Sequence, residues 1–193
     1  MTAPKSKTSS STADVLIMDA EAIARALRRV AHEIIERNPA LETIVLAGIP
    51  SRGIEIARRL ASLIEEFGKR PVELGVIDVS MHRDDVGQRA ELPRVQASHL
   101  PVPLEGRTVV IVDDVFYTGR TTRAAMDAIG SFGRPARIQL ATLIDRGHRE
   151  LPIRADFVGK NLPTAPGERV RLRLQNVDGE PDAVWLIKEG EPS

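Results

Sequence analysis

Short apolar runs alternate along the chain with longer segments in which apolar residues recur every three or four positions. The runs at 43–47, 71–80, 109–112, 137–144 and 155–158 are mainly apolar and have the length of single strands. The intervening segments have the periodicity of amphipathic helices. This alternation predicts an α/β fold with a doubly wound, mostly parallel sheet flanked by helices.

Three helices follow from the periodicity. Asp19 is a good N-cap for a helix over 20–37, and a second helix is predicted over 54–67. The apolar stripe of the first helix is Ile23, Leu27, Val30 and Ile34. A third helix follows the 109–112 strand, and Gly133 ends it. Its apolar face consists of Ala124, Ala125, Ala128, Ile129 and Phe132.

Two adjacent acids and a hydroxyl-rich loop join the 109–112 strand to the third helix. Asp113 and Asp114 come first, and the loop 117–122 then supplies three threonine hydroxyls around Gly119. Hydroxyls, a glycine and the N–H groups that open a helix together suit a phosphate. The two acids could not hold a bare phosphate, but they could bind a vicinal diol directly or through a divalent metal. The segment therefore predicts a site for a ribose 5-phosphate unit at the carboxyl end of a strand.

Simpler explanations exist for each part of this segment. An acidic pair after a strand more often begins a loop and caps a helix, and a single glycine usually marks a turn. It is the combination that favours a ligand site. No Gly-Lys-Ser/Thr follows, which excludes a Walker loop, and the chain contains no G-x-G-x-x-G dinucleotide motif.

A second candidate anion site lies at Gly48–Gly53, where Ser51 and Arg52 stand between a strand and a helix. An ordinary strand-to-helix turn would explain it equally well. The polar stretch 81–103 is long for a compact domain, and it is either disordered or a working lid. His148 has no visible nucleophile partner, which favours a binding or structural role.

Composition narrows the class of protein. The 193 residues suffice for one domain over 14–193, and the Ser/Thr/Lys-rich segment 1–13 is predicted to be a disordered tail. The absence of cysteine excludes disulfides and thiolate metal sites. No apolar run approaches the roughly 18 residues of a membrane span. We therefore expect a soluble, cytoplasmic protein that does not bind membranes.

The net charge is zero, so no overall field attracts nucleic acid. One Trp, one Tyr and four Phe provide few platforms for stacking bases, so nucleic-acid binding would depend on Arg and Lys. Arg25, Arg28, Arg29 and His32 share one face of the first predicted helix, and Arg37 lies near its end. A solvated charged face is the usual explanation of such a pattern.

Residues 109–122 resemble the phosphoribosyl pyrophosphate signature of the type I phosphoribosyltransferases: four apolar residues, two acids and a Thr-Gly-x-Thr loop. The resemblance is closer still to the PyrR proteins, bifunctional pyrimidine operon attenuators with uracil phosphoribosyltransferase activity. It is carried also by 30–38, by GIPSRG at 48–53 and by 133–164, and it covers nearly the whole chain after about residue 14.

The resemblance implies the type I phosphoribosyltransferase fold with a small hood, to which 157–161 belong. Apolar and polar residues alternate at 169–175 and 183–188, which predicts a C-terminal β-hairpin. The resemblance implies that uracil and phosphoribosyl pyrophosphate give UMP and pyrophosphate, with Mg²⁺ bound mainly through substrate oxygens. It also implies UMP-dependent binding of pyrimidine operon leader mRNA and a homodimer or higher oligomer. The alternative is a nucleobase-salvage phosphoribosyltransferase without an RNA-binding role. Whether regulation acts on transcription or on translation is left open.

The resemblance also assigns residues to roles. The catalytic set is Asp113, Asp114 and Arg52, and the two acids also face the metal through substrate and water. The substrate set is Ser51, Arg52, Arg83, Asp113, Asp114, Val115, Phe116, Tyr117, Thr118, Gly119, Arg120, Thr121, Thr122, Arg146, Phe157, Val158 and Lys160. The RNA-binding set is Arg28, Arg29, His32, Arg37, His148 and Lys160. Core packing is the simpler role for at least one of Phe157 and Val158. Three positions depart from the family, which more often has Thr at Ser51, Tyr at His82 and a small hydroxyl residue at Arg28.

Overall fold

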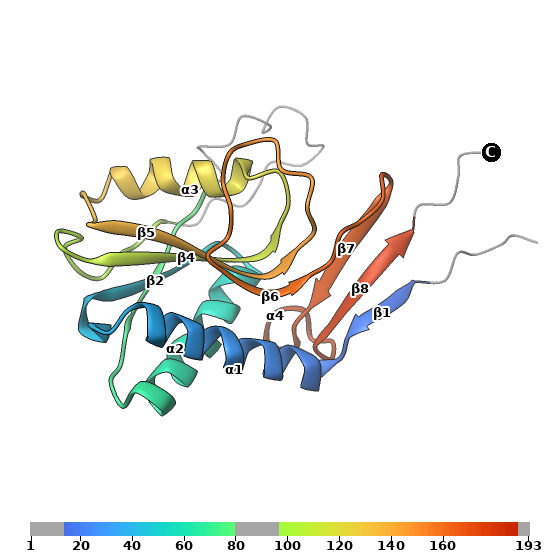
Figure 1. Ribbon diagram of the computed structural model, residues 1–193, viewed down its shortest axis with the longest axis horizontal. Coiled ribbons are helices and arrows are strands. Elements are labelled where there is room, and N and C mark those ends of the chain that lie inside the picture. Colours follow the sequence, from blue (N-terminus) through green and yellow to red (C-terminus); the bar gives the residue numbers. More distant parts are fainter. Residues whose placement is uncertain (1–13, 80–96, 189–193) are drawn as a thin grey trace, which may run out of the picture.

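The protein, described here from a computed structural model, has two sheets (Figure 1). The structure describes residues 14–79 and 97–188. Its strands are β1 (Val15–Met18), β2 (Ile44–Gly48), β3 (Glu73–Val76), β4 (Thr108–Phe116), β5 (Arg137–Asp145), β6 (Phe157–Asn161), β7 (Glu168–Arg173) and β8 (Ala183–Lys188). Its helices are α1 (Ala20–Arg37), α2 (Arg52–Gly68), α3 (Arg120–Gly130) and α4 (Gln175–Asp178), with a 3-10 turn at Leu41–Thr43.

The larger sheet is parallel, with strand order β3-β2-β4-β5-β6. Helices α1 and α2 cover one of its faces and α3 covers the other (Figure 1). Because successive residues of a strand point to opposite faces, Leu46 of β2 packs with α1 and α2, whereas Val45 and Ala47 pack with α3. The predicted α/β fold with a parallel sheet is therefore confirmed.

The smaller sheet is antiparallel, with strand order β1-β8-β7, and it lies at the end of the domain next to β6 (Figure 1). Strands β7 and β8 form the predicted C-terminal hairpin, although the connection between them contains the short helix α4. Leu172 and Val184 of this sheet belong to the same buried cluster as the residues under α1 and α2. One continuous core thus fixes the small sheet against the large one.

Helix α1 matches the sequence prediction closely. The Asp19 carboxylate accepts a hydrogen bond of 2.8 Å from the backbone N–H of Ala22, as an N-cap should. The predicted apolar stripe is buried, with Ile23 and Ile34 fully enclosed. No helix in the described ranges is both long and apolar enough to cross a membrane.

Replacing Asp19 with alanine should lower the free energy of unfolding by about 1 kcal/mol, because the N–H of Ala22 loses its acceptor. Urea denaturation of the two proteins measures the difference. Asp19→Asn, which retains a side-chain oxygen, should lose much less. An alanine variant as stable as the wild type would show that the cap contributes nothing to stability.

Two element boundaries in the central region differ from the prediction. Strand β4 continues through the acids to Phe116, because β5 extends beside it and pairs Asp113 with Thr142. Helix α3 ends at Gly130, where the N–H groups of the next two residues bond three residues back and tighten the last turn. Phe132 consequently lies outside the helix and is 41% exposed, so placing it on the apolar face was wrong.

Three further expectations need correction. Residues 157–161, assigned to a hood, form the edge strand β6 of the parallel sheet because they pair with β5. Strand β3 is shorter than 71–80. The end of the predicted 81–103 loop belongs to the packed domain, since His99 forms a backbone bridge with Val76 and Leu100 is buried. The rest of that loop, and the predicted tail 1–13, lie outside the described residues.

Candidate functional site

The carboxyl ends of β2, β4 and β5 meet at one edge of the parallel sheet, and the loops that follow them are joined by hydrogen bonds. The N–H of Ile49, after β2, donates to the Val112 carbonyl of β4 at 2.9 Å. The N–H of Arg146, after β5, donates to the Phe116 carbonyl at 3.0 Å. Ligands of open α/β sheets bind at this edge. The structure therefore brings the two predicted anion sites and Arg146 to one place.

The two acids are held rigidly within the last half of β4. Asp113 is only 7% exposed, and its carboxylate accepts a hydrogen bond of 2.9 Å from the N–H of Asp114. The Asp114 carboxylate accepts another, also 2.9 Å, from the N–H of Val115. Asp114 is more accessible than Asp113, and its charge is close enough to Arg52 to raise the pKa of that guanidinium, after the larger effect of Asp178. The pair thus presents carboxylate oxygens at the sheet edge.

Carboxylate oxygens are suitable partners for a hard cation such as Mg²⁺. The described residues contain no group of three or more His, Asp or Glu side chains able to enclose a metal. Two neighbouring carboxylates fit an ion that keeps most of its waters and takes its other oxygens from a phosphorylated ligand. The donor set therefore fits Mg²⁺ in that mode.

The loop after β4 turns into α3 at Gly119, whose φ of 94° is unfavourable for residues with a Cβ. The N–H groups of Glu150 and Leu151 donate to the Thr118 carbonyl at 3.0 and 3.2 Å and hold the turn. The backbone N–H groups at the start of α3 follow directly, as an anion site requires. The Arg120 side chain turns to Glu150, with which it forms an ion pair of 2.9 Å.

The Tyr117 ring contacts two side chains of the loop that follows β5, those of Arg146 and His148. The Arg146 guanidinium lies 4.0 Å from the Tyr117 ring centre, and the His148 ring meets it edge-on at 5.8 Å. Arg146 also donates to the Thr164 hydroxyl at 3.2 Å and to the Glu168 carbonyl at 2.7 Å, and His148 Nε2 lies 2.6 Å from the Thr164 carbonyl. These contacts connect the signature loop to the segment between β6 and β7.

Arg52, at the start of α2, has a partner that sequence reasoning missed. Its Nε and Nη2 donate to the two carboxylate oxygens of Asp178 at 3.1 and 2.7 Å. The hydrogen bond to Asp178 raises the pKa of Arg52, which stays charged. Asp178 belongs to α4, and nothing in its local sequence indicates this pairing. Ser51 precedes the helix and is exposed, and the peptide bond between Pro50 and Ser51 is cis.

A second ion-pair network links α2 to the start of β8. Arg59 pairs with both Glu55 and Asp182, and Asn176 donates to Glu55 at 2.7 Å. Burial alone would raise the pKa values of Glu55 and Asp182, but these hydrogen bonds outweigh burial and lower both pKa values. The network fixes α4, and with it Asp178, against the helix that carries Arg52.

This network predicts acid sensitivity. The pKa values of Glu55 and Asp182 are lower in the folded protein than their ordinary values of 4.5 and 3.8, so the network stabilises the fold above those values. That stability should be lost as the pH falls below them. Urea unfolding across a pH series should show this loss, with a smaller pH dependence in Asp182→Asn. An equal pH dependence in both proteins would contradict the assignment.

Several predicted site residues do not present side chains to this edge. Phe116 and Phe157 are 1% and 2% exposed in the two cores, so their part in a site is limited to the backbone. Val158 packs against the core under α3. Thr122 is buried, and its hydroxyl has no hydrogen-bond partner among the described residues. Arg83 lies outside the described residues.

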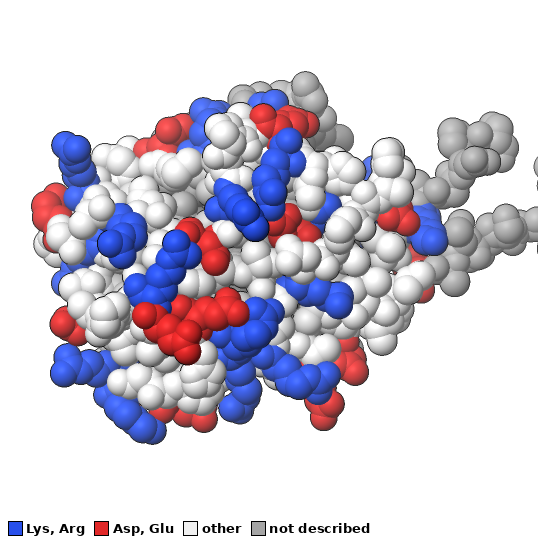
Figure 2. All heavy atoms as spheres, in the orientation of Figure 1, with Lys and Arg blue, Asp and Glu red and all other residues white. Residues whose placement is uncertain are grey.

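The basic residues predicted on α1 are exposed, but they do not act as a single array. Arg28 and His32 turn to Phe67 at the end of α2, where the His32 ring stacks at 4.2 Å. Arg29 turns the other way, pairs with Glu33 and donates to the Val158 carbonyl at 3.0 Å. Figure 2 shows acidic and basic side chains interspersed on this side of the molecule.

A basic groove nevertheless runs beside the Arg29 edge of α1. Arg25 and Arg29 of α1 and Lys160 of β6 line it, with apolar residues of β1 and α1 at its base, and its volume is about 400 Å³. Arg37 lies further along the helix and forms an ion pair of 3.2 Å with Asp156. Arg25 was not among the residues assigned to RNA binding, although its helical spacing already placed it on the same face.

Solved structures with the same fold are phosphoribosyltransferases. The hypoxanthine phosphoribosyltransferase of Trypanosoma cruzi in complex with the product IMP has a TM-score of 0.66 and 21% identity, covering 90% of this chain and 89% of that one. A hypoxanthine-guanine phosphoribosyltransferase of Bacillus anthracis has a TM-score of 0.63 and 20% identity, covering 77% and 84%. Identities this low establish the fold alone.

Sequence relatives are much closer. The phosphoribosyl transferase domain family matches residues 16–175. A protein of Roseiflexus sp. (strain RS-1) is 56% identical over 172 residues, which is 89% of this chain and 94% of the relative. One of Thermus aquaticus is 51% identical over 174 residues, covering 90% and 96%. Both are named Bifunctional protein PyrR. With these matches and this fold, the chain belongs to the PyrR family of phosphoribosyl transferase domain proteins.

Proposed function

We propose that this protein converts uracil and phosphoribosyl pyrophosphate to UMP and pyrophosphate, and that it regulates pyrimidine biosynthesis genes by binding operon leader mRNA when UMP is bound. The observation that carries the proposal is the pair of fixed acids at the sheet edge beside a hydroxyl-rich helix start, in a chain of the PyrR family. Both activities use one nucleotide site, which catalyses UMP formation and senses its product.

In this proposal Asp113 and Asp114 accept hydrogen bonds from the ribose diol, and the backbone of 117–122 with the hydroxyls of Thr118 and Thr121 binds the 5′-phosphate. The negative charge of the two aspartates also stabilises the positive charge that develops on the ribose as the pyrophosphate leaves. Mg²⁺, held by the two acids through water, would neutralise charge on the pyrophosphate oxygens. Catalysis then comes from positioning and electrostatics, without a covalent nucleophile.

Arg52 is the proposed cationic group for the leaving pyrophosphate, and its pairing leaves it able to act. A guanidinium has five N–H donors, of which Asp178 engages two. The remaining donors can serve an anion while Asp178 fixes the plane of the group. Ser51 and Arg52 share the pyrophosphate loop in this proposal, and Arg83, assigned to the same ligand, lies outside the described residues.

Base selection separates this proposal from a purine-salvage form of its alternative, a nucleobase-salvage enzyme without an RNA role, and RNA binding separates it from a uracil-salvage form. Arg146, Lys160 and the backbone of β6 are the proposed base-pocket elements. The test is a product assay with phosphoribosyl pyrophosphate and Mg²⁺, offering uracil, hypoxanthine and guanine separately. Conversion of uracil alone supports the proposal. Conversion of only the purines would favour the salvage alternative.

The proposed RNA interface comprises Arg28, Arg29, His32, Arg37, His148 and Lys160. Two of these residues also have structural roles, because Arg29 bonds to β6 and His148 bonds to the Thr164 carbonyl. Arg28 is a better probe, since it is exposed and rests on Phe67, near the end of α2 remote from Arg52. A homodimer would present two copies of this interface to one RNA.

Arg28→Glu should weaken binding of the leader RNA by roughly tenfold or more, because a phosphate contact is replaced by repulsion. Uracil turnover should stay unchanged. Electrophoretic mobility shift at fixed salt measures the first and UMP production measures the second. Arg70→Glu reverses an exposed charge two residues after the end of α2, at a residue that pairs with Glu42; it is the control and should retain RNA binding. Equal RNA affinity of Arg28→Glu and wild type would remove Arg28 from the interface.

A further inference from the structure

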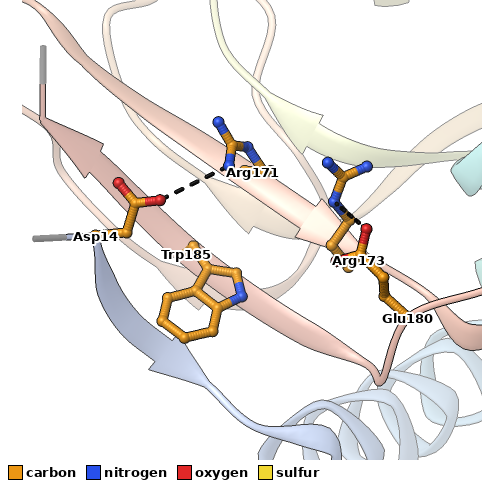
Figure 3. A pocket seen from close by; sticks show the side chains of 5 residues that line it. All are labelled: Asp14, Arg171, Arg173, Glu180 and Trp185. Carbon is orange, nitrogen blue, oxygen red and sulfur yellow. Dashed lines mark ion pairs between the residues drawn. The ribbon is translucent and has the colours of Figure 1, made fainter. Parts of the chain in front are cut away.

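The outer face of the antiparallel sheet carries a pocket apart from the site at the parallel sheet edge, although one lining residue, Arg173, shares the Asp178 carboxylate with Arg52. It has a volume of about 230 Å³ and is lined by Asp14, Arg171, Arg173, Glu180 and Trp185 (Figure 3). Arg171 pairs directly with Trp185 across β7 and β8, so both side chains project from the same face of the sheet.

Trp185 is the only tryptophan in the chain, and it is partly exposed in this pocket. Its neighbour Val184 points to the opposite face and is fully buried in the core. The indole is therefore not needed to fill the core on which the small sheet packs. An aromatic ring on an open sheet face is the platform on which nucleic-acid bases stack.

Arginines occupy alternate positions of β7 beside this ring. Arg169, Arg171 and Arg173 share the outer face, and a strand rise of about 3.3 Å per residue separates neighbours by about 7 Å. Arg171 lies 3.7 Å from Asp14 and the Arg173 Nε lies 3.6 Å from Glu180, both longer than a hydrogen bond. Arg173 Nη1 also donates to Asp178 at 3.3 Å, which fixes that guanidinium and leaves its other donors on the outer face. The exposed pairs with Asp14 and Glu180 are weak, so a phosphate can replace either of these two acids.

We propose that this arginine–tryptophan groove, formed by Arg171, Arg173 and Trp185, binds single-stranded RNA. One base stacks on the indole, and the flanking phosphates bind the guanidiniums of β7. The pocket is smaller than the roughly 300 Å³ or more of typical small-molecule sites, so it takes one base of a strand and leaves its neighbours on the open face. The groove is separate from the RNA interface proposed on α1 and shares no residue with it.

The single tryptophan makes the test direct. Oligouridylate of about ten nucleotides is titrated into the full-length protein while Trp185 emission is recorded, in parallel with anisotropy of the labelled strand. Stacking should quench the emission in a saturable way that follows the anisotropy, and the affinity should fall with added salt. Binding by anisotropy without any change in emission would overturn the proposal, because the strand would then lie elsewhere.

Variants separate the groove from the interface on α1. Arg171→Gln should weaken oligouridylate binding several-fold and lower its salt slope by about one, whereas Arg70→Gln, in an exposed ion pair of 3.4 Å, should change neither. Trp185→Ala should weaken binding by about tenfold, the size expected for loss of one stacked base. Because Arg28→Glu leaves the groove intact, quenching should persist in that variant even where leader binding fails.

Other occupants would give distinct results. Quenching by free UMP but not by the oligonucleotide would identify a mononucleotide site and overturn the proposal. A shift of Trp185 emission with protein concentration, in the absence of RNA, would identify a second copy of the chain as the occupant. Unchanged affinity of both Arg171→Gln and Trp185→Ala would contradict the groove as an RNA contact.

Discussion

Asp114→Asn is expected to lower kcat for UMP formation by at least about a hundredfold. The substitution retains the shape of the side chain and an oxygen that can still accept the N–H of Val115. It removes the negative charge that would stabilise the ribosyl transition state and hold the metal through water. The loss should therefore appear in turnover, with the melting temperature nearly unchanged.

Steady-state kinetics with uracil and phosphoribosyl pyrophosphate measure this effect, and circular dichroism monitors the fold. Asp127→Asn is the matched control, since Asp127 is an exposed acid of α3 that pairs only at the surface with Arg123 at 3.2 Å. It should retain full activity. Wild-type turnover in Asp114→Asn would exclude the acid from the mechanism and leave Asp113 to act alone.

Gly53→Ala should cost about 2 to 3 kcal/mol of stability and also abolish most activity. A Cβ at this position would lie 2.5 Å from the carbonyl oxygen of Val112, the residue that precedes Asp113. The same oxygen accepts a hydrogen bond from the N–H of Ile49. A shift of β4 or of α2 would therefore disturb both the loop after β2 and the loop after β4 at the sheet edge. The glycine permits the close approach that brings Arg52 to the acids.

The chain provides a matched control for this substitution. A Cβ on Gly130, at the end of α3, would have nothing within 4 Å. Gly130→Ala should leave activity unchanged and keep or slightly raise stability, because alanine is the better helix former. Urea denaturation and uracil turnover of the two variants make the comparison. Equal behaviour of both would show that the approach of α2 to β4 is not a tight constraint.

Features encoded by local spacing were predictable from the sequence. Each of these features is encoded by residues that are close together in the sequence. Examples are the apolar period of α1, its Asp19 cap, and the acids followed by a Thr-Gly-x-Thr loop. Strand and helix alternation was enough to give the parallel sheet. Membership of the family was also visible, because its signature is contiguous.

Features that depend on distant partners were not predictable. Asp178 meets Arg52 across 126 residues, and the splitting of the α1 basic face depends on Phe67 and on the carbonyls of β6. Strand β4 lengthened because β5 offered it partners as far as Asp145. In each case tertiary pairing decided the outcome, and no local period encodes which distant group will be available.

One nucleotide site is proposed to serve both catalysis and regulation. The most direct test is the affinity of the wild-type protein for its native pyrimidine operon leader RNA, measured at one stated salt concentration with and without UMP, alongside Asp114→Asn. UMP should tighten RNA binding in the wild type, and Asp114→Asn should weaken this response together with turnover. Leader binding that UMP leaves unchanged, in a protein that still converts uracil to UMP, would contradict this proposal.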